Sequence, residues 1–185
     1  MRNPPLQLQK GGNTTNLFPC ANWQQKCEAV GFHFYNMYGE PYWYESACYH
    51  FSASEINELE AATNSLQELY IEAAERIIAE DHFSQLCIPP ELAELCRQSW
   101  ERDEPSLYGR FDLAYDGVNP PKLLEYNADT PTALLETSVV QWTWLEEMFP
   151  EADQFNSVLE KLLAAFEEMN GLGGETLYFI SCPLE

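Results

Sequence analysis

Four polar side chains between positions 110 and 127 have the types and spacing that best fit a chemical role in this chain. Two runs of strand-forming residues enclose the turn sequence DGVNPP at positions 116–121, which predicts an antiparallel β-hairpin. With the turn centred in this sequence, Asp112 lies opposite Glu125 and Arg110 lies opposite Asn127. Side chains alternate between the two faces of a strand, so we expect these four to share one face.

The residue types on that face suit a hard cation and its anionic ligand. Asp112, Glu125 and Asn127 offer the carboxylate and amide oxygens that Mg²⁺ prefers over softer ligands. Arg110 can bind a carboxylate or phosphate through two parallel hydrogen bonds, which a lysine cannot reproduce. The competing interpretation is a solvated sheet surface that binds nothing. The opposite face is expected to be buried and consists of Phe111, Leu113, Tyr115, Leu124 and Tyr126.

The composition narrows the classes of partner. A chain of 185 residues with 45% hydrophobic residues predicts one packed domain. The formal net charge of −21 argues against nucleic acid and against an anionic membrane as partners. No apolar run reaches the length of a transmembrane helix. An acidic surface attracts a cationic substrate such as a polyamine, but it is also an ordinary feature of a soluble protein.

The six cysteines predict free thiols in a reducing, cytoplasmic environment. They form no Cys-x-x-Cys pair and no zinc-type spacing, and several fall at positions predicted to face a core. The first ten residues contain no apolar segment of the kind found in signal peptides. The cysteines are Cys20, Cys27, Cys48, Cys87, Cys96 and Cys182.

Helix signals predict the elements that surround the hairpin. Ser52 and Glu55 form a capping box, which predicts the start of a long amphipathic helix that ends near Glu80. Thr130 followed by Pro131 predicts another helix start, whose unpaired amides favour an anion. The other predicted elements are helices over 22–30, 91–102, 131–148 and 151–169, a helix stop at 170–174 and a strand over 176–181.

At the hairpin the sequence resembles the glutathionylspermidine synthase family, whose synthetase domain has an ATP-grasp architecture. The resemblance rests on YGRFD at 108–112, KLLEYNADTP at 122–131 and SVVQW at 138–142, with GEPYW at 39–43 and LEAAT at 59–63 upstream. The chain looks most like the stand-alone acid–amine ligases, which lack an amidase domain. The resemblance implies an α/β (α+β) fold, the N-terminal part of an ATP-grasp protein, with long helices packed on a small sheet that contains the hairpin.

The resemblance also implies a role for each polar residue of the hairpin. The residue matching Arg110 contacts both ATP phosphate and the glutathione carboxylate, so Arg110 is the expected catalytic, substrate-binding and cofactor-binding residue. The residues matching Asp112, Glu125 and Asn127 hold magnesium, and Asp112 thereby also contacts the nucleotide cofactor. The residue matching Thr130 helps to bind glutathione.

The implied reaction is ATP-dependent amide formation with Mg²⁺ and ATP as cofactors. A glutathione-like acid would attack the γ-phosphate, giving an acyl phosphate and ADP, and a polyamine-like amine would then displace phosphate. Thr132 and Ser138 are candidates for lining the pocket of the acid, with core or capping roles as the alternative.

The sequence departs from the family in length, since it is half as long as the resemblance implies. The expected organisation is an N-terminal arm over 1–20, a substrate- and Mg²⁺-binding part of the synthetase domain over 21–175, and the start of a further, truncated unit over 176–185. No P-loop or Gly-rich phosphate cradle is present, so we expect no ATP turnover by this chain alone. One alternative is a truncated or degenerate non-catalytic protein that keeps the fold and binds a small thiol peptide or amine. Another is an acidic, cation-binding module without ligase ancestry.

Overall fold

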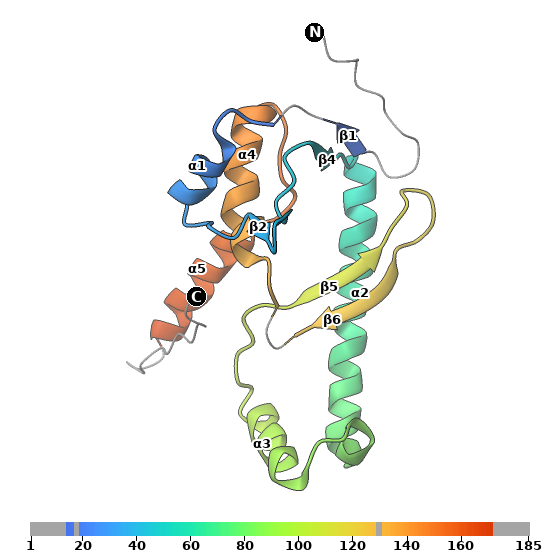
Figure 1. Ribbon diagram of the computed structural model, residues 1–185. Helices are drawn as coiled ribbons and strands as arrows, with labels where there is room; N and C mark the ends of the chain where they lie inside the picture. The colour runs from blue at the N-terminus through green and yellow to red at the C-terminus, as the bar shows by residue number, and fades with distance from the viewer. Residues whose placement is uncertain (1–13, 17–18, 129–130, 172–185) are drawn as a thin grey trace. The chain divides into compact units, whose positions relative to one another are not determined.

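Helices and small antiparallel sheets alternate along the chain (Figure 1). The computed structural model describes residues 14–16, 19–128 and 131–171. The chain divides into two units, Met1–Thr132 and Ala133–Glu185, and each is described by itself. The combination of helices with antiparallel strand pairs confirms the predicted α/β (α+β) class. Within the described ranges, no helix combines the length and the apolar character needed to cross a membrane.

The longest helix, α2 (Ala53–Ala79), begins where the capping box predicts. The backbone N–H of Glu55 donates to the Ser52 hydroxyl over 3.3 Å, and the backbone N–H of Ser52 donates to a Glu55 carboxylate oxygen over 2.7 Å. These bonds satisfy amides that the first turn leaves without helical partners. The helix ends at Ala79 with Glu80 as its C-cap, close to the predicted end, and a short 3-10 turn, η1 (His82–Leu86), follows.

The predicted hairpin is present, and its register is the predicted one across the four polar residues. Asp112 pairs with Glu125, and Arg110 pairs with Asn127. The register shifts by one position immediately towards the turn, where Leu113 pairs with Leu123. The two strands are β5 (Arg110–Ala114) and β6 (Lys122–Asn127).

The face predicted to be buried is half-buried at Phe111, Leu113, Tyr115 and Tyr126, and the prediction is wrong for one residue, Leu124. The shift leaves Leu124 without a residue directly opposite, and its side chain is 69% exposed. Leu123 takes the half-buried position instead. A one-residue offset moves a side chain to the other face of a strand, which accounts for the exchange.

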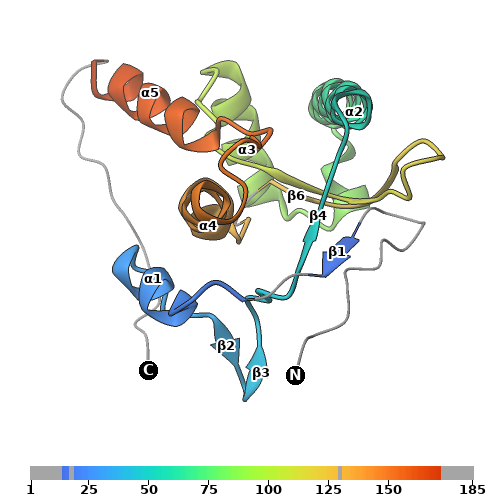
Figure 2. The same cartoon turned by 90° about the horizontal axis from the view of Figure 1, so that it is seen from above.

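Aromatic contacts fix the hairpin against α2, which Figure 2 views almost end on. The ring centroids of Phe111 and Tyr126 lie 4.1 Å apart in a stacked arrangement, and Tyr70 of α2 meets Tyr126 edge-on at 4.7 Å. The Tyr126 hydroxyl donates to the Gln67 side chain over 2.9 Å. Aromatic pairs in these geometries contribute about 0.5–1.5 kcal/mol beyond their buried area. The apolar face of the hairpin is thus anchored to a helix, as the sequence predicts.

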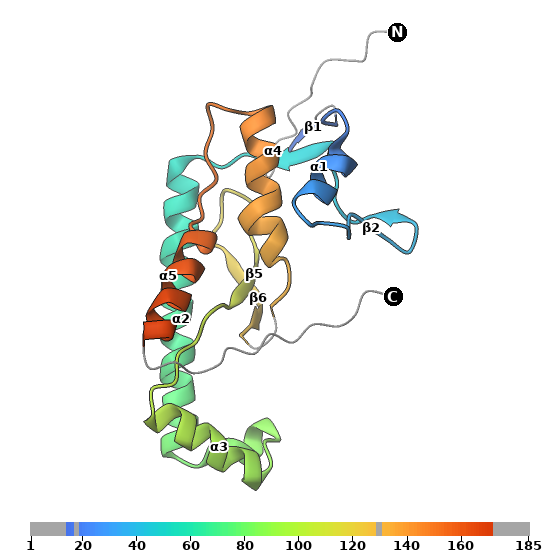
Figure 3. The same ribbon diagram turned by 90° about the vertical axis from the view of Figure 1, so that its left-hand side faces the viewer.

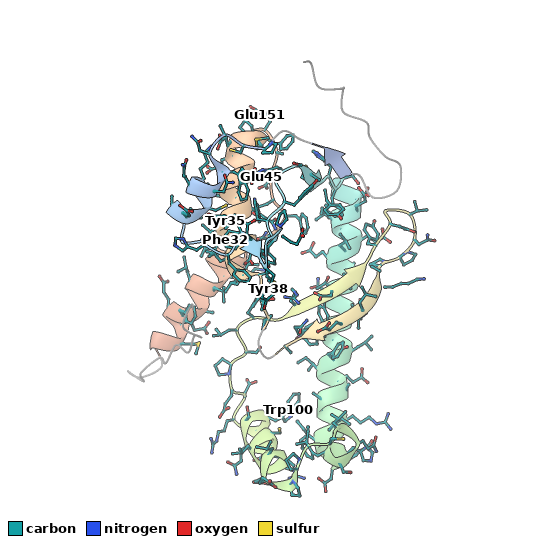
Figure 4. The ribbon with its side chains drawn as sticks, viewed as in Figure 1. Phe32, Tyr35, Tyr38, Glu45, Trp100 and Glu151 are labelled. Atoms are coloured by element: carbon teal, nitrogen blue, oxygen red, sulfur yellow. The ribbon has the colours of Figure 1, made fainter. Side chains whose placement is uncertain are left out.

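A small core surrounds helix α1 (Trp23–Ala29) and the segments on either side of it. Cys20, Cys27 and Phe32 are buried there, and so is Glu45 (Figure 4 labels Phe32 and Glu45). The Glu45 carboxylate accepts hydrogen bonds from the backbone N–H of Cys20 over 3.2 Å and from the indole N–H of Trp43. Burial raises the pKa of the Cys27 thiol to about 11, so this thiol stays protonated at neutral pH.

The other elements of the first unit agree with the sequence where it makes a prediction. Helices α1 and α3 lie within two residues of the predicted bounds. Five cysteines in the described part of the chain are free thiols: Cys20, Cys27, Cys48, Cys87 and Cys96. Cys182 lies outside the described residues. The remaining elements are β1 (Thr14–Asn16), α1 (Trp23–Ala29), β2 (Asn36–Met37), β3 (Glu40–Pro41), β4 (Ala47–Tyr49) and α3 (Pro90–Glu101); β1 pairs with β4, and β2 pairs with β3.

The described part of the second unit, residues 133–171, contains two helical segments and their connection (Figure 3). A wide, π-helical turn, η2 (Glu136–Val140), runs directly into α4 (Gln141–Met148), and α5 (Val158–Gly171) follows the connecting segment. The hydroxyl of Ser138 donates to the carbonyl of Leu134 over 2.6 Å, so this buried side chain has a helix-internal role.

Both predicted helix starts near this unit are wrong. Pro131 and Thr132 are not helical, and Ala133 has a φ of 69°, in the left-handed region, so helical structure begins only at position 134. The predicted helix from 151 begins instead at Val158. Its preceding segment, EADQFNS, is rich in Asp, Asn and Ser, whose side chains compete for backbone hydrogen bonds and disfavour a helix interior. Residues 172–174 of the predicted helix stop and the strand predicted over 176–181 lie outside the described residues, as does most of the predicted arm over 1–20.

Replacing the cap residue tests the start of α2. Ser52→Ala removes the hydroxyl that accepts from the Glu55 amide, so the free energy of unfolding should fall by about 1 kcal/mol. Urea denaturation followed by circular dichroism measures this change. Ser65→Ala, at an exposed position inside the same helix, is the matched control and should leave stability unchanged or slightly higher. Equal stabilities for Ser52→Ala and the wild type would contradict the cap.

Candidate metal and anion site

The four predicted polar residues lie on two neighbouring strands whose pairing sets their positions. Arg110 and Asp112 belong to β5, and Glu125 and Asn127 belong to β6 directly opposite them. The structure therefore brings together the four residues that the sequence places on one face. Thr130, predicted to bind the acid substrate, lies outside the described residues.

The guanidinium of Arg110 is the centre of a hydrogen-bond network. Its Nε donates to Asp112 Oδ1 over 2.7 Å and its Nη2 donates to Asp112 Oδ2 over 3.2 Å. Its Nη1 donates to the Thr132 carbonyl over 3.0 Å and to the Thr132 hydroxyl over 2.9 Å. The Arg110 and Asp112 side chains are 31% and 38% exposed, so solvent and small ligands can reach the pair.

The paired hydrogen bonds from Arg110 Nε and Nη2 to the Asp112 carboxylate, called here the Arg110–Asp112 fork, shift the pKa values of both residues. The hydrogen bonds from Arg110 lower the pKa of the Asp112 carboxyl, and burial opposes them only in part. The same hydrogen bonds to Asp112 raise the pKa of Arg110, with smaller contributions from the charges of Tyr108 and Glu125. At neutral pH the site therefore contains an ionised carboxylate and a permanently charged guanidinium.

Asn127 and Glu125 complete the face with oxygens that the network does not use. The Asn127 amide nitrogen is buried and has no hydrogen-bond partner among the described residues. Because the nitrogen and oxygen of a side-chain amide exchange places by a flip, this position can instead present an oxygen to a cation or water. The Glu125 side chain is exposed and lies opposite Asp112 in the register.

The donor set fits magnesium. Two carboxylates and one amide supply oxygens alone, and Mg²⁺ usually completes its octahedron with waters and phosphate oxygens. Within the described ranges, no three His, Cys, Asp or Glu side chains gather into a cluster, so a metal here would have few protein ligands. Asp112 presents its two oxygens to Arg110, which means that a metal must compete with the guanidinium for them.

A glycine beside the site allows the hairpin to lie close to its own aromatic anchor. A Cβ atom at Gly109 would lie 3.0 Å from Tyr126 Cε2 and 3.1 Å from the Tyr126 hydroxyl. Since Tyr126 packs against Phe111 and Tyr70, its ring has little room to move. The absence of a side chain at Gly109 thus lets the backbone that leads into Arg110 lie against the packed Tyr126 ring.

Thr132 is the residue whose role sequence reasoning left open. The sequence suggests either a pocket-lining role or a capping role for it, and the structure makes it the acceptor of Arg110 Nη1. The sequence feature that could have indicated this role is the position of Thr132 directly after the NADTP string, in the segment that follows β6.

Comparison with known proteins identifies the class of this chain. The family described as glutathionylspermidine synthase preATP-grasp matches residues 15–184, so the chain belongs to this family. This match confirms the resemblance carried by the hairpin and its flanking strings.

Named relatives agree with this assignment. The chain is 41% identical over 162 residues to a putative acid–amine ligase of Haemophilus influenzae, covering 82% of this chain and 40% of the relative. It is 39% identical over 80 residues to glutathionylspermidine synthase of Crithidia fasciculata, covering 40% of this chain and 11% of the relative. It is 32% identical over 110 residues to the bifunctional glutathionylspermidine synthetase/amidase of Escherichia coli, covering 58% and 17%. The chain thus spans 40% or less of the length of each of these relatives.

The Arg110–Asp112 fork predicts a specific titration. Because the folded pKa of Asp112 is lowered, the pair stabilises the fold above the carboxyl's unfolded pKa, and this contribution is lost as the pH falls through the folded pKa. Arg110→Gln removes the main cause, so the Asp112 pKa should rise towards its ordinary value. Carboxyl ¹³C NMR measures it. Asp116, whose pKa the Asn119 amide lowers to about 2, is the internal control and should not change. An Asp112 pKa that is the same in both proteins would contradict the fork.

Proposed function

We propose that this chain supplies the magnesium- and anion-binding hairpin of an ATP-dependent acid–amine ligase. The observation that carries the proposal is the arrangement of Arg110 and Asp112 as a fork on the same hairpin face as Glu125 and Asn127. A cation site and an anion site side by side are what a metal–nucleotide complex requires. The names of the relatives, a putative acid–amine ligase and glutathionylspermidine synthases, support the reaction class.

Each residue of the hairpin has a distinct part in this proposal. Asp112, Glu125 and Asn127 would hold Mg²⁺, which neutralises charge on the phosphate oxygens of ATP. Arg110 binds a phosphate oxygen and the carboxylate of the acid through paired hydrogen bonds. Thr130 would contact the acid.

The chemistry that suits these groups is electrostatic. The carboxylate of a glutathione-like acid attacks the γ-phosphate and releases ADP, giving an acyl phosphate. The nitrogen of a polyamine-like amine then attacks the carbonyl carbon, displaces inorganic phosphate and loses a proton to form the amide. Arg110 moves no proton, because its pKa is raised further above the ordinary value. Its contribution is to hold negative charge that develops during phosphoryl transfer. The net charge of −21 favours the approach of a cationic amine.

Removing a metal ligand tests the cation half of the proposal. Asp112→Asn and Glu125→Gln should each weaken Mg²⁺ binding by at least about tenfold, because even outer-shell changes commonly cost that much. Isothermal titration at physiological ionic strength measures binding above the background of surface acids. Asp116→Asn removes one charge of the same kind at the turn, where the carboxylate accepts from Val118 and Asn119, and is the matched control. If all three variants bind Mg²⁺ equally, the hairpin is not the metal site.

Replacing the guanidinium of Arg110 by the ammonium group of lysine tests the proposed anion-binding role of Arg110. Arg110→Lys keeps the positive charge but loses the paired donors, so binding of pyrophosphate in the presence of Mg²⁺ should weaken by about tenfold, the worth of a hydrogen bond to a charged group. Titration calorimetry against the wild type gives the ratio. Arg102→Lys is the control, since Arg102 lies outside the hairpin and is mostly exposed. Near-normal pyrophosphate binding by Arg110→Lys would refute the anion role.

A further inference from the structure

The guanidinium of Arg110 has two edges, and the structure gives them to different partners. The Nε–Nη2 edge donates to the two carboxylate oxygens of Asp112 at 2.7 and 3.2 Å. The remaining nitrogen, Nη1, donates to the carbonyl and hydroxyl of Thr132 at 3.0 and 2.9 Å. Each edge can therefore be released without releasing the other.

The edge given to Asp112 is also the edge that an anionic ligand needs. A guanidinium binds carboxylate or phosphate most strongly through two parallel N–H donors, and the Nε–Nη2 pair is such a fork. A metal that takes the oxygens of Asp112 would leave this fork without its acceptors. An arginine side chain with no other contact would then be free to rotate about several bonds.

We propose that Thr132 is the positioning residue of Arg110. It retains Nη1 when a metal occupies Asp112, so the Nε–Nη2 fork stays in the site and passes from Asp112 to the anion. Metal and anion then bind cooperatively, because the first ligand exposes a donor pair that is already held in place. This inference rests on the proposed function, since it assumes that Asp112 is a metal ligand and Arg110 an anion contact.

The simpler interpretation is that Thr132 only tethers the segment after β6 to the hairpin. A tether would affect the stability of the chain and the binding of every ligand alike. A positioning residue would affect the anion and leave the metal unchanged. The two roles therefore differ in which ligand a substitution disturbs.

The first experiment compares Thr132→Val with Thr132→Ser in the 185-residue chain. Valine matches threonine in shape but removes the hydroxyl, one of the two acceptors of Nη1, whereas serine keeps it; the backbone carbonyl acceptor is present in both variants. With Mg²⁺ saturating, Thr132→Val should bind pyrophosphate about tenfold more weakly than the wild type, and the serine variant should bind within about twofold of it. Mg²⁺ affinity measured alone should be the same in all three. Equal pyrophosphate affinities, or a parallel loss of Mg²⁺ affinity in the valine variant, would overturn the proposal.

The second experiment needs no ligand. In Asp112→Ala the carboxylate is gone, as it would be for the guanidinium once a metal had taken it, and Thr132 should still hold the side chain. The ¹H–¹⁵N heteronuclear NOE of Arg110 Nε should stay high in Asp112→Ala. It should be lower in Asp112→Ala/Thr132→Val, where the backbone carbonyl of residue 132 is the one remaining acceptor of the two that residue 132 offers to Nη1. A value already low in Asp112→Ala would show that Thr132 does not retain the guanidinium.

The two experiments separate the failure of this inference from the failure of the proposed function. A wild-type chain that binds neither Mg²⁺ nor pyrophosphate would refute the function and, with it, the cooperative step. Normal binding by the wild type with no effect of Thr132→Val would leave the function standing and overturn the positioning role alone.

Discussion

The contact between the hairpin and α2 is the interaction on which the rest of the site depends. A two-stranded hairpin is marginally stable in water by itself, so its polar face can be rigid only if its apolar face is packed. Phe111 and Tyr126 stack on each other and meet Tyr70 of the helix, which supplies that packing. The capping box at Ser52 is connected to the hairpin through this contact, because it fixes where the supporting helix begins.

The polar face contains its own counter-ion, which offsets the repulsion between its two carboxylates without a bound ligand. Asp112 and Glu125 lie opposite each other in a chain with a large excess of acids, and Arg110 is the internal counter-ion that makes this arrangement tolerable. A divalent cation could take over the same task, which would free the arginine for a different anion. The metal and the guanidinium would then neutralise the Asp112 carboxylate in turn. This exchange connects the ion pair of the hairpin with its proposed chemistry.

The parts of the fold that the sequence predicted correctly are those set by local rules. The pairing of Asp112 with Glu125 followed from strand alternation and the turn sequence, and the start of α2 followed from its cap. The helix expected at Pro131 failed for a non-local reason, since the Thr132 carbonyl accepts from Arg110, 22 positions away, and Ala133 turns the chain out of helical geometry. The exposure of Leu124 also could not be foreseen, because it results from a shift in pairing that no residue type marks.

That shift between Asp112 and Leu113 divides the ladder into two halves with different residue offsets. In a regular hairpin, adding one residue to the connection would reverse the faces of every side chain beyond it. Here the irregularity already absorbs an odd residue between the loop and the polar cluster. Moving or removing the irregularity would therefore accommodate a one-residue change in the length of the loop over 116–121 without reorienting the polar cluster.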